Sequence, residues 1–380
     1  MRYFIIAGEA SGDMHGAKLI RELKNIDGNA EFIGLGGYLM RDAGCRLIQD
    51  YRQMAYMGFV AVAMNFRKIR RNFSLTYKAI LDFKPDHLIL IDYPTFNLKI
   101  ASFVKKHLPQ TKISYYIPPK VWAWKTWRIH KIASVSDHIL GIFPFEPDFY
   151  SKYGYRAEYV GNPTLDAVND YLNSHSVSIT KRQIAIVPGS RRYEVEKCLP
   201  VMLKGVQPFV NDYDIIVTMA PTLDEKLYRS IIKAMGLEQH ISLTRDTYDS
   251  VVESSIAVVN SGTATLETAL LNVPQVAVYH VEFPHIMAAL RNILFSIKNF
   301  TLVNIIAGRS VIRELLATEF KSENIENELH HIINDETYRN NILNGYQDIR
   351  SILSSPHQAA VTASGIIYDA TCEGTSINSL

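Results

Sequence analysis

Residues Val259 to Glu267 combine types that suit a nucleotide site. They read Val-Asn-Ser-Gly-Thr-Ala-Thr-Leu-Glu, which predicts a buried strand, a small polar turn and a helix. The first N–H groups of a helix are unpaired and positively polarised, so they attract a phosphate. Ser261 or Thr263 could cap the helix, and Gly262 would let a phosphate approach. Glu267 could then hold the two hydroxyls of a ribose; an ordinary capped turn with a solvated glutamate is the alternative.

A second small-residue turn, Pro188-Gly189-Ser190-Arg191-Arg192, follows another apolar run. Two arginines with no adjacent acid would lie at the carboxyl end of the predicted strand. Guanidinium groups make fork-like contacts with phosphate oxygens. We therefore predict that Gly189, Ser190 and Arg191 contact a phosphate, whereas a solvated surface pair is the alternative.

Asp92 directly follows 87–91, the most hydrophobic run in the first half of the chain. Ligands of open α/β sheets bind at the carboxyl ends of strands. A carboxylate beside so apolar a strand could have a raised pKa and serve as a general base. A helix cap is the alternative, although Thr95 and Asn97 are better placed to cap. The turn at residues 8–13 occupies the equivalent end of the first predicted strand.

All three tryptophans fall in one short basic segment, with no acid between Thr111 and Ile132. Clustered aromatic and cationic side chains are typical of a surface that binds an amphipathic anion. Packing of the tryptophans in the core is the alternative. The segment contains Trp122, Trp124, Lys125, Trp127 and Arg128.

The stretch between Tyr51 and Phe73 also lacks acids, and its apolar residues recur with the spacing of one helix face. Basic amphipathic helices commonly lie on anionic membrane surfaces. A helix that packs on the core and exposes its basic face is the alternative. The apolar residues are Phe59, Val62, Phe66, Ile69 and Phe73, and the cations include Arg67, Lys68, Arg70 and Arg71.

The elements that must position these residues alternate between apolar strands and helices. This alternation predicts α/β architecture, with parallel strands covered by helices on both faces. The plan restarts near residue 184, so we predict two Rossmann-like domains facing each other across a cleft, at 1–165 and 182–355. Residues 356–380 are expected to form a helix returning to the first domain, then a tail; one large doubly wound sheet is the alternative. The predicted strands are 3–7, 31–37, 87–91, 113–117, 139–142, 184–187, 215–219 and 256–259.

Composition excludes several classes of protein. The 380 residues are 47% hydrophobic and 21% charged, which is ordinary for globular proteins and rules out a disordered or collagen-like chain. A net charge of +2 argues against binding nucleic acid over the whole surface. The three cysteines are far apart and form no CxxC pair, so neither a disulfide framework nor a zinc site is expected. No apolar run is long enough to span a membrane as a single helix.

Six motifs, in order, resemble those of the lipid-A-disaccharide synthase family, from about residue 3 to about 369. The Val-Trp-Ala-Trp run is especially specific. The resemblance implies an inverting, metal-independent glycosyltransferase with the two-domain GT-B fold and no cofactor. A UDP-sugar epimerase of the same fold and a non-catalytic membrane-docking protein are the alternatives. The motifs lie at residues 8–13, 91–97, 119–124, 188–191, 261–267 and 304–309.

The family resemblance also implies substrates, a location and residue roles. The donor would be UDP-diacylglucosamine and the acceptor diacylglucosamine 1-phosphate, used at the cytoplasmic face of an anionic inner membrane; a homodimer is left open. At Asn162 many relatives have histidine, so no imidazole role is carried over. UDP would bind at 261–267. The implied catalytic residues are Asp92, Arg191, Asn304 and Ser11, and those near the acceptor phosphate are Glu9, Trp124, Lys125 and Arg128.

Overall fold

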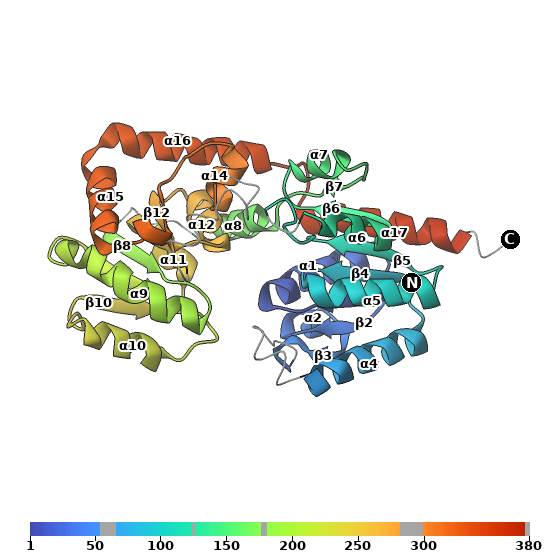
Figure 1. Cartoon of the computed structure of the whole chain (residues 1–380). Coiled ribbons are helices and arrows are strands. Elements are labelled where there is room, and N and C mark those ends of the chain that lie inside the picture. Colours follow the sequence, from blue (N-terminus) through green and yellow to red (C-terminus); the bar gives the residue numbers. More distant parts are fainter. Residues whose placement is uncertain (54–65, 124–125, 176–180, 282–298, 377–380) are drawn as a thin grey trace. The chain divides into compact units, whose positions relative to one another are not determined.

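The computed structural model describes residues 1–53, 66–123, 126–175, 181–281 and 299–376. The chain divides into two compact units, each built on one parallel sheet (Figure 1). The first unit comprises Met1–Pro163 and Ser355–Leu380, and the second comprises Thr164–Ser354. The predicted α/β fold class is therefore confirmed.

The sheet of the first unit has the order β3-β2-β1-β4-β5-β6-β7. Ala7 of β1 pairs with Ile91 of β4, and Ile91 pairs with Tyr116 of β5, so these three strands end together. The strand order reverses between β1 and β4, which is where open α/β sheets bind ligands. The strands are β1 Arg2–Ala7, β2 Glu31–Gly36, β3 Arg46–Asp50, β4 His87–Ile91, β5 Lys112–Tyr116, β6 His138–Gly141 and β7 Glu158–Tyr159.

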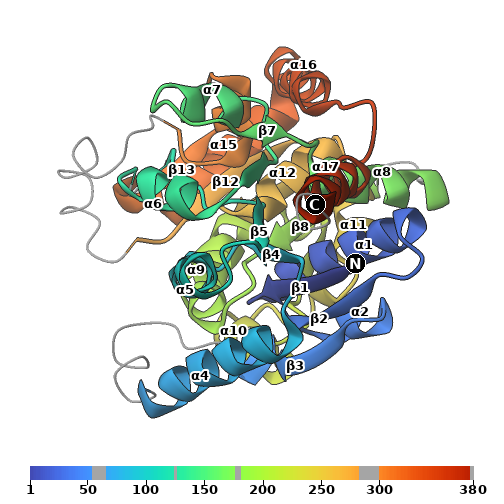
Figure 2. The same ribbon diagram turned by 90° about the vertical axis from the view of Figure 1, so that its right-hand side faces the viewer.

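Helices cover both faces of this sheet because successive strand residues point to opposite sides. Phe4 and Ile6 join the apolar cluster beneath α5 and α6, whereas Tyr3 and Ile5 join the cluster beneath α1 and α17. Figure 2 shows these two helix pairs on opposite sides of β1 and β4. The helices are α1 Ala10–Ile26, α2 Tyr38–Asp42, α4 Phe66–Phe83, α5 Pro94–His107, α6 Arg128–Val135, α7 Glu146–Ser151 and α17 Ala359–Ser376, with a 3₁₀ turn at Tyr51–Gln53.

The last helix is tied to the first sheet by a buried histidine. In His87, Nδ1 lies 2.8 Å from the Thr371 hydroxyl of α17, and Nε2 lies 2.8 Å from the Ser114 hydroxyl of β5. Burial lowers the pKa of His87 to about 3, so the ring is neutral. Helix α17 also packs along α1.

The sheet of the second unit has the order β10-β9-β8-β11-β12-β13. Val187 at the end of β8 pairs with Val259 of β11, and Asn260 pairs with Val278 of β12. The turns that follow β8 and β11 therefore lie side by side. The strands are β8 Lys181–Val187, β9 Asp214–Thr218, β10 Ile241–Thr244, β11 Ser254–Asn260, β12 Gln275–Tyr279 and β13 Glu314–Leu316.

The second unit begins with a helix, because the polar stretch after Pro163 forms α8 and not an extended linker. Helices α9 and α15 pack together, and α16 packs on α12 and α14. No helix among the described residues is long and apolar enough to cross a membrane. The helices are α8 Pro163–Ser174, α9 Arg192–Val206, α10 Glu225–Ala234, α11 Thr247–Val252, α12 Thr263–Leu270, α14 Leu302–Ala307, α15 Ser322–Asn334 and α16 Glu336–Leu353, with 3₁₀ turns at Gln207–Phe209 and Ala317–Glu319.

Candidate active site

Asp92 occupies a strained turn at the carboxyl end of β4. Its φ is +43° and that of Tyr93 is +47°, in the left-handed region that costs a residue with a side chain about 1–3 kcal/mol. Two groups hold this turn through the Asp92 carbonyl, which accepts hydrogen bonds from Asn97 Nδ2 and the Tyr115 hydroxyl, each at 2.7 Å. Strain that persists under such restraint is typical of functional sites.

The environment of Asp92 favours its use as a base. Burial raises the pKa of its carboxyl group above the usual aspartate range. The positive charge of Lys120 and a hydrogen bond from the Tyr93 backbone N–H partly oppose this rise. The carboxylate is thus a stronger base than an exposed aspartate.

The turn after β1 lies against the Asp92 turn. A Cβ atom at Gly8 would lie 2.2 Å from the Tyr93 ring, so only glycine allows this approach. The buried Asp13 carboxylate caps α2 by accepting hydrogen bonds from the backbone N–H groups of residues 37, 39 and 40 at 2.7–3.1 Å. Glu9 stands at the N-cap position of α1, and Ser11 is exposed in its first turn. Gly8 and Asp13 therefore have structural roles here, and Glu9 and Ser11 are the polar side chains at this edge.

Trp122 belongs to the core, as the alternative interpretation of its segment holds. Its side chain is 5% exposed and packs edge-on against Phe143 and Phe145. The indole N–H donates to Glu146 Oε1 at 3.1 Å. Glu146 Oε2 accepts from the backbone N–H groups of Ile142 and Phe143 at 2.8 and 3.0 Å, and burial raises the pKa of Glu146 to about 7. Glu146, which the sequence analysis missed, thus anchors the loop that carries Lys120 toward Asp92.

Trp127, unlike Trp122, lies on the surface. Trp127 is 67% exposed, and the guanidinium of Arg128 lies 5.4 Å from its ring centre. Trp124 and Lys125 lie outside the described residues. The exposed Trp127 ring and the half-buried Arg128 guanidinium thus form a cation–aromatic pair that is available to an anionic ligand at the start of α6.

In the turn after β8, each of the two arginines pairs with an acid, so the expectation that they have no adjacent acid is wrong. Arg191 Nη1 lies 3.2 Å from Glu194 Oε1, and Arg192 Nη1 lies 3.1 Å from Glu196 Oε1. Both arginine side chains are exposed, so each pair contributes at most about 1 kcal/mol. Arg191 can therefore exchange Glu194 for a phosphate at little cost.

The backbone N–H groups of the same turn are less available to a phosphate than the Arg191 side chain is. Glu194 Oε2 accepts from the N–H groups of Ser190 and Arg191 at 3.0 and 3.1 Å, which caps α9 from within the chain. Gly189 has a φ of +119°, and a Cβ atom there would lie 2.6 Å from Glu194 Oε2. A phosphate at these N–H groups would have to displace Glu194, so the guanidinium is the accessible donor of this turn.

In the turn after β11, by contrast, the first N–H groups of the following helix are not capped by a side chain. Gly262 is the N-cap residue of α12, and no side chain caps the helix, so the expectation that Ser261 or Thr263 would do so is wrong. Gly262 and Thr263 are exposed, and no neighbouring atom lies within 4 Å of a Cβ built at Gly262. An uncapped, accessible helix N-terminus at the carboxyl edge of a parallel sheet is suited to an anion.

Glu267 lies one turn further along α12, and its carboxylate is not simply solvated. The side chain is half-buried, and Oε1 accepts a hydrogen bond from the Tyr248 hydroxyl at 2.9 Å. Burial raises the pKa of Glu267, and the bond from Tyr248 partly opposes this rise.

Comparison with known proteins adds to this geometry. The family described as lipid-A-disaccharide synthetase matches residues 3–362. The chain belongs to this family. It is 35% identical over 347 residues to the lipid-A-disaccharide synthase of Geobacter sulfurreducens, covering 89% of both chains. It is 36% identical over 382 residues to that of Syntrophus aciditrophicus, covering 97% of this chain and 98% of the relative. As a family member, the chain is a glycosyltransferase that forms the lipid A disaccharide.

Solved structures confirm the GT-B fold. A putative UDP-N-acetylglucosamine 2-epimerase from Listeria monocytogenes aligns with a TM-score of 0.63 and 12% identity, covering 96% of this chain and 94% of the epimerase. A glycosyltransferase of kitacinnamycin aligns with a TM-score of 0.63 and 10% identity, covering 97% and 98% of the two chains. Identities this low establish the fold alone. The family match does not favour the epimerase and docking-protein alternatives.

Asn304, which family resemblance suggests is catalytic, is engaged within the protein. It is 1% exposed. Its Nδ2 donates to the Ile312 carbonyl and to Glu314 Oε1, both at 2.9 Å. Its Oδ1 accepts from the N–H groups of Val311 and Ile312 at 2.7 and 3.0 Å. These four bonds use the full capacity of the amide. Asn304 therefore positions the loop between α14 and β13, and direct contact with a substrate would require these bonds to break.

Replacing this amide should cost stability. We expect Asn304→Ala to lower the free energy of unfolding by roughly 2–4 kcal/mol, because it leaves several buried groups without partners. Urea denaturation measures the loss, with Asn324→Ala as control, since half-exposed Asn324 makes one bond to the Glu319 carbonyl. Equal stability of the two variants would contradict the positioning role.

The basic helix α4 is described from Phe66 onward, which divides the predicted apolar stripe. Phe73 packs on Phe96 with ring centres 4.5 Å apart and contacts the core, and Ile69 is half-buried. Phe59 and Val62 lie outside the described residues, as do the side chains of Phe66 and Arg67. The described end of the stripe thus packs inward. The cations Lys68, Arg70 and Arg71 are exposed.

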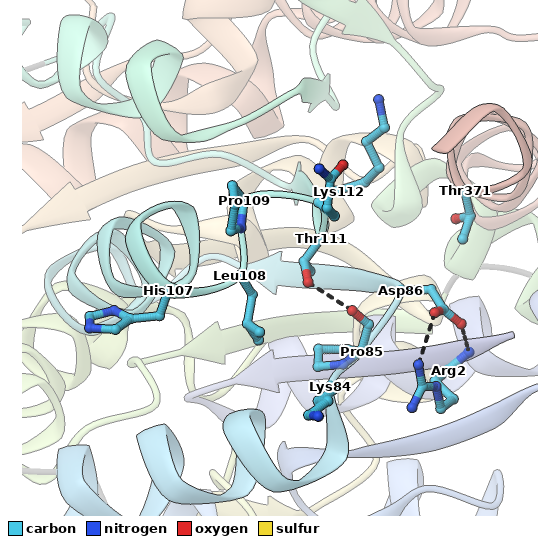
Figure 3. Close-up of a pocket in the computed structure, with 11 residues that line it drawn as sticks. Arg2, Lys84, Pro85, Asp86, His107, Leu108, Pro109, Thr111, Lys112 and Thr371 are labelled. Atoms are coloured by element: carbon cyan, nitrogen blue, oxygen red, sulfur yellow. Dashed lines mark hydrogen bonds and ion pairs between the residues drawn. The ribbon is translucent and has the colours of Figure 1, made fainter. Parts of the chain in front are cut away.

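Two further polar places in the first unit do not form a ligand site. Asn162 is buried and donates to the Ile142 carbonyl at 3.0 Å, so it is part of the fold. A cavity of about 290 Å³ lies at the amino end of the first sheet (Figure 3). Arg2 pairs there with Asp86 at 3.3 Å. The lysines that line it, Lys84 and Lys112, lie at opposite sides of the cavity, so they do not form a convergent anion site. The described residues contain no group of three side chains able to hold a metal.

Proposed function

We propose that the chain transfers 2,3-diacylglucosamine from UDP to 2,3-diacylglucosamine 1-phosphate. The products are the β-1,6-linked disaccharide 1-phosphate and UDP. The observation that carries the proposal is Asp92, a partly buried carboxylate with a raised pKa, held in a strained turn at the strand switch point of the first unit. An aspartate with these properties is suited to take a proton from a sugar hydroxyl.

The donor occupies the carboxyl edge of the second sheet in this proposal. The uncapped N-terminus of α12 receives the diphosphate, and the Glu267 carboxylate accepts hydrogen bonds from the ribose hydroxyls. Arg191 exchanges its exposed pair with Glu194 for diphosphate oxygens. The acceptor belongs to the first unit, where Glu9, Ser11 and Arg128 are the described polar candidates.

The reaction is a single displacement with inversion. The acceptor 6-hydroxyl attacks the anomeric carbon while Asp92 takes its proton. The bond from that carbon to the diphosphate breaks, and its electron pair leaves with UDP. Negative charge grows on the leaving diphosphate, so Arg191 and the α12 dipole stabilise the transition state more than the bound donor.

Acylated substrates remain in a bilayer, and this supports a peripheral position on the cytoplasmic face of the inner membrane. The exposed cations of α4 suit an anionic surface, since each contributes about 1 kcal/mol there. Such binding is reversible and weakens with salt.

Charge reversal on α4 tests this position. We expect Arg70→Glu with Arg71→Glu to weaken binding to anionic vesicles at least about tenfold. Co-sedimentation at low and high salt measures it. The control is Lys226→Glu with Lys233→Glu on α10, which makes the same change in net charge at exposed sites. Equal effects of the two double variants would show that only net charge matters and would contradict a docking role for α4.

UDP release from UDP-2,3-diacylglucosamine, with and without acceptor, tests the proposed function. Release that requires the acylated acceptor supports it. Formation of an epimerised UDP-sugar without acceptor, or no reaction at all, would refute it.

A further inference from the structure

Tyr248 is the second residue of α11, next to the carboxyl edge where Glu267 lies. We propose that Tyr248 is a positioning residue, which holds the Glu267 carboxylate ready for the vicinal diol of a ribonucleoside diphosphate. This inference rests on the proposed function and adds a residue that neither the sequence motifs nor the mechanism uses.

The geometry of the pair is specific. The Tyr248 hydroxyl donates to Glu267 Oε1 at 2.9 Å. Among the described residues, no other group donates a hydrogen bond to this carboxylate. Burial raises the pKa of Tyr248 above its usual value, so the hydroxyl keeps its proton and remains a donor. The second carboxylate oxygen, and one lone pair of the first, are thus left for hydroxyl groups of a ligand.

A neighbouring aromatic side chain fixes Tyr248 in turn. The Tyr171 ring of α8 meets the Tyr248 ring edge-on, with centres 5.2 Å apart and an interplanar angle of 87°. The Tyr171 hydroxyl donates to Asp249, the residue after Tyr248. Helices α8 and α11 therefore set the direction from which the Tyr248 hydroxyl reaches Glu267.

The hydroxyl has two physical effects on the carboxylate. It selects one orientation, which would otherwise have to be fixed when the ligand binds. It also stabilises the ionised form against the burial that raises the pKa of Glu267. A diol donates two hydrogen bonds, so it needs an ionised, correctly oriented carboxylate.

The test is a thermodynamic cycle on UDP binding. Tyr248→Phe keeps the ring and its contact with Tyr171 but removes the hydroxyl. We expect it to weaken UDP binding about tenfold, or about 1.4 kcal/mol, measured by calorimetry on the full chain. The reason is that the Glu267 carboxylate must then be ionised and oriented as the ligand binds. The matched control is Tyr213→Phe, which makes the same change at the amino end of β9. The guanidinium of Arg182 lies over the ring of Tyr213, and this contact does not need the hydroxyl.

Two further arms separate positioning from a structural role. In a Glu267→Gln background, Tyr248→Phe should have little further effect, because the hydroxyl acts through the carboxylate. Binding of 2′-deoxy-UDP, which lacks the diol, should change much less than binding of UDP. Equal losses for the two nucleotides, or additive losses in the double variant, would overturn the positioning role.

The outcomes also distinguish this inference from the proposed function. If the wild-type chain binds UDP and prefers it to 2′-deoxy-UDP, but Tyr248→Phe binds both as before, only the inference fails. If the wild-type chain binds no UDP, the proposed function fails and the inference with it.

Discussion

Asp92→Asn is expected to lower kcat by roughly two to four powers of ten, the usual contribution of a general base. The amide keeps the shape of the side chain but cannot take the acceptor proton. UDP affinity should stay unchanged, because the proposed donor site lies in the second unit. Steady-state kinetics and calorimetry with UDP measure the two quantities.

The control for this variant is Asp82→Asn, since Asp82 is exposed on α4 and pairs with Lys78. A pH profile adds a second criterion. Burial raises the pKa of Asp92, so the acid limb of kcat/KM should lie above the usual aspartate range, with activity lost as pH falls through that pKa. Near-normal turnover of Asp92→Asn would remove Asp92 from the mechanism. So would an acid limb that is the same in Asp92→Asn as in the wild-type protein.

Arg191→Ala is expected to lower kcat about 10²–10³-fold, with a smaller loss of donor affinity. The diphosphate gains negative charge as its bond to the sugar breaks, so the guanidinium stabilises the transition state more than the ground state. Single-turnover kinetics separates the chemical step from binding, and calorimetry with UDP gives the affinity.

Arg192→Ala is the matched control, because Arg192 has similar exposure and a similar ion pair one residue away. It should retain most activity. If Arg191→Ala loses turnover and donor affinity equally, Arg191 only binds the ground state. If Arg192→Ala matches Arg191→Ala, general positive charge near α9 is sufficient.

The strands next to the proposed site were predictable because they are buried on both faces. Strands β1, β4, β8 and β11 are central in their sheets, so the sequence shows them as continuous apolar runs with turn residues after them. All eight predicted strands are confirmed, seven of them within two residues at each end, whereas β8 begins three residues earlier than predicted. Edge strands such as β3 and β7 were missed, because β3 is half-exposed and β7 has only two residues.

Helix capping was harder to predict than helix position. Sequence spacing suggests Ser261 or Thr263 as the cap of α12, but Gly262 takes that position without a side-chain bond. For α9, the cap comes from Glu194, the third residue of the helix, and the same carboxylate pairs with Arg191. A Glu at this spacing is a recognisable capping signal that the sequence analysis did not use.

Partners distant in sequence could not be predicted from single motifs. Nothing near Trp122 indicates that its indole donates to Glu146, 24 residues away, while Trp127 stays exposed. Similarly, the four hydrogen bonds of Asn304 depend on how the following loop folds back. Composition identified the tryptophan segment, and the family resemblance pointed to Asn304, but only the fold separates residues that bind from residues that hold others in place.

The stereochemistry and stoichiometry of one reaction test the central claim most directly. Wild-type protein is incubated with UDP-2,3-diacylglucosamine and 2,3-diacylglucosamine 1-phosphate, and the product is analysed by NMR and mass spectrometry. The account predicts one UDP released per disaccharide 1-phosphate, with a β-linkage to the 6-position. An α-linkage would contradict the single displacement with Asp92 as base, and UDP release without disaccharide would contradict transfer to the acylated acceptor.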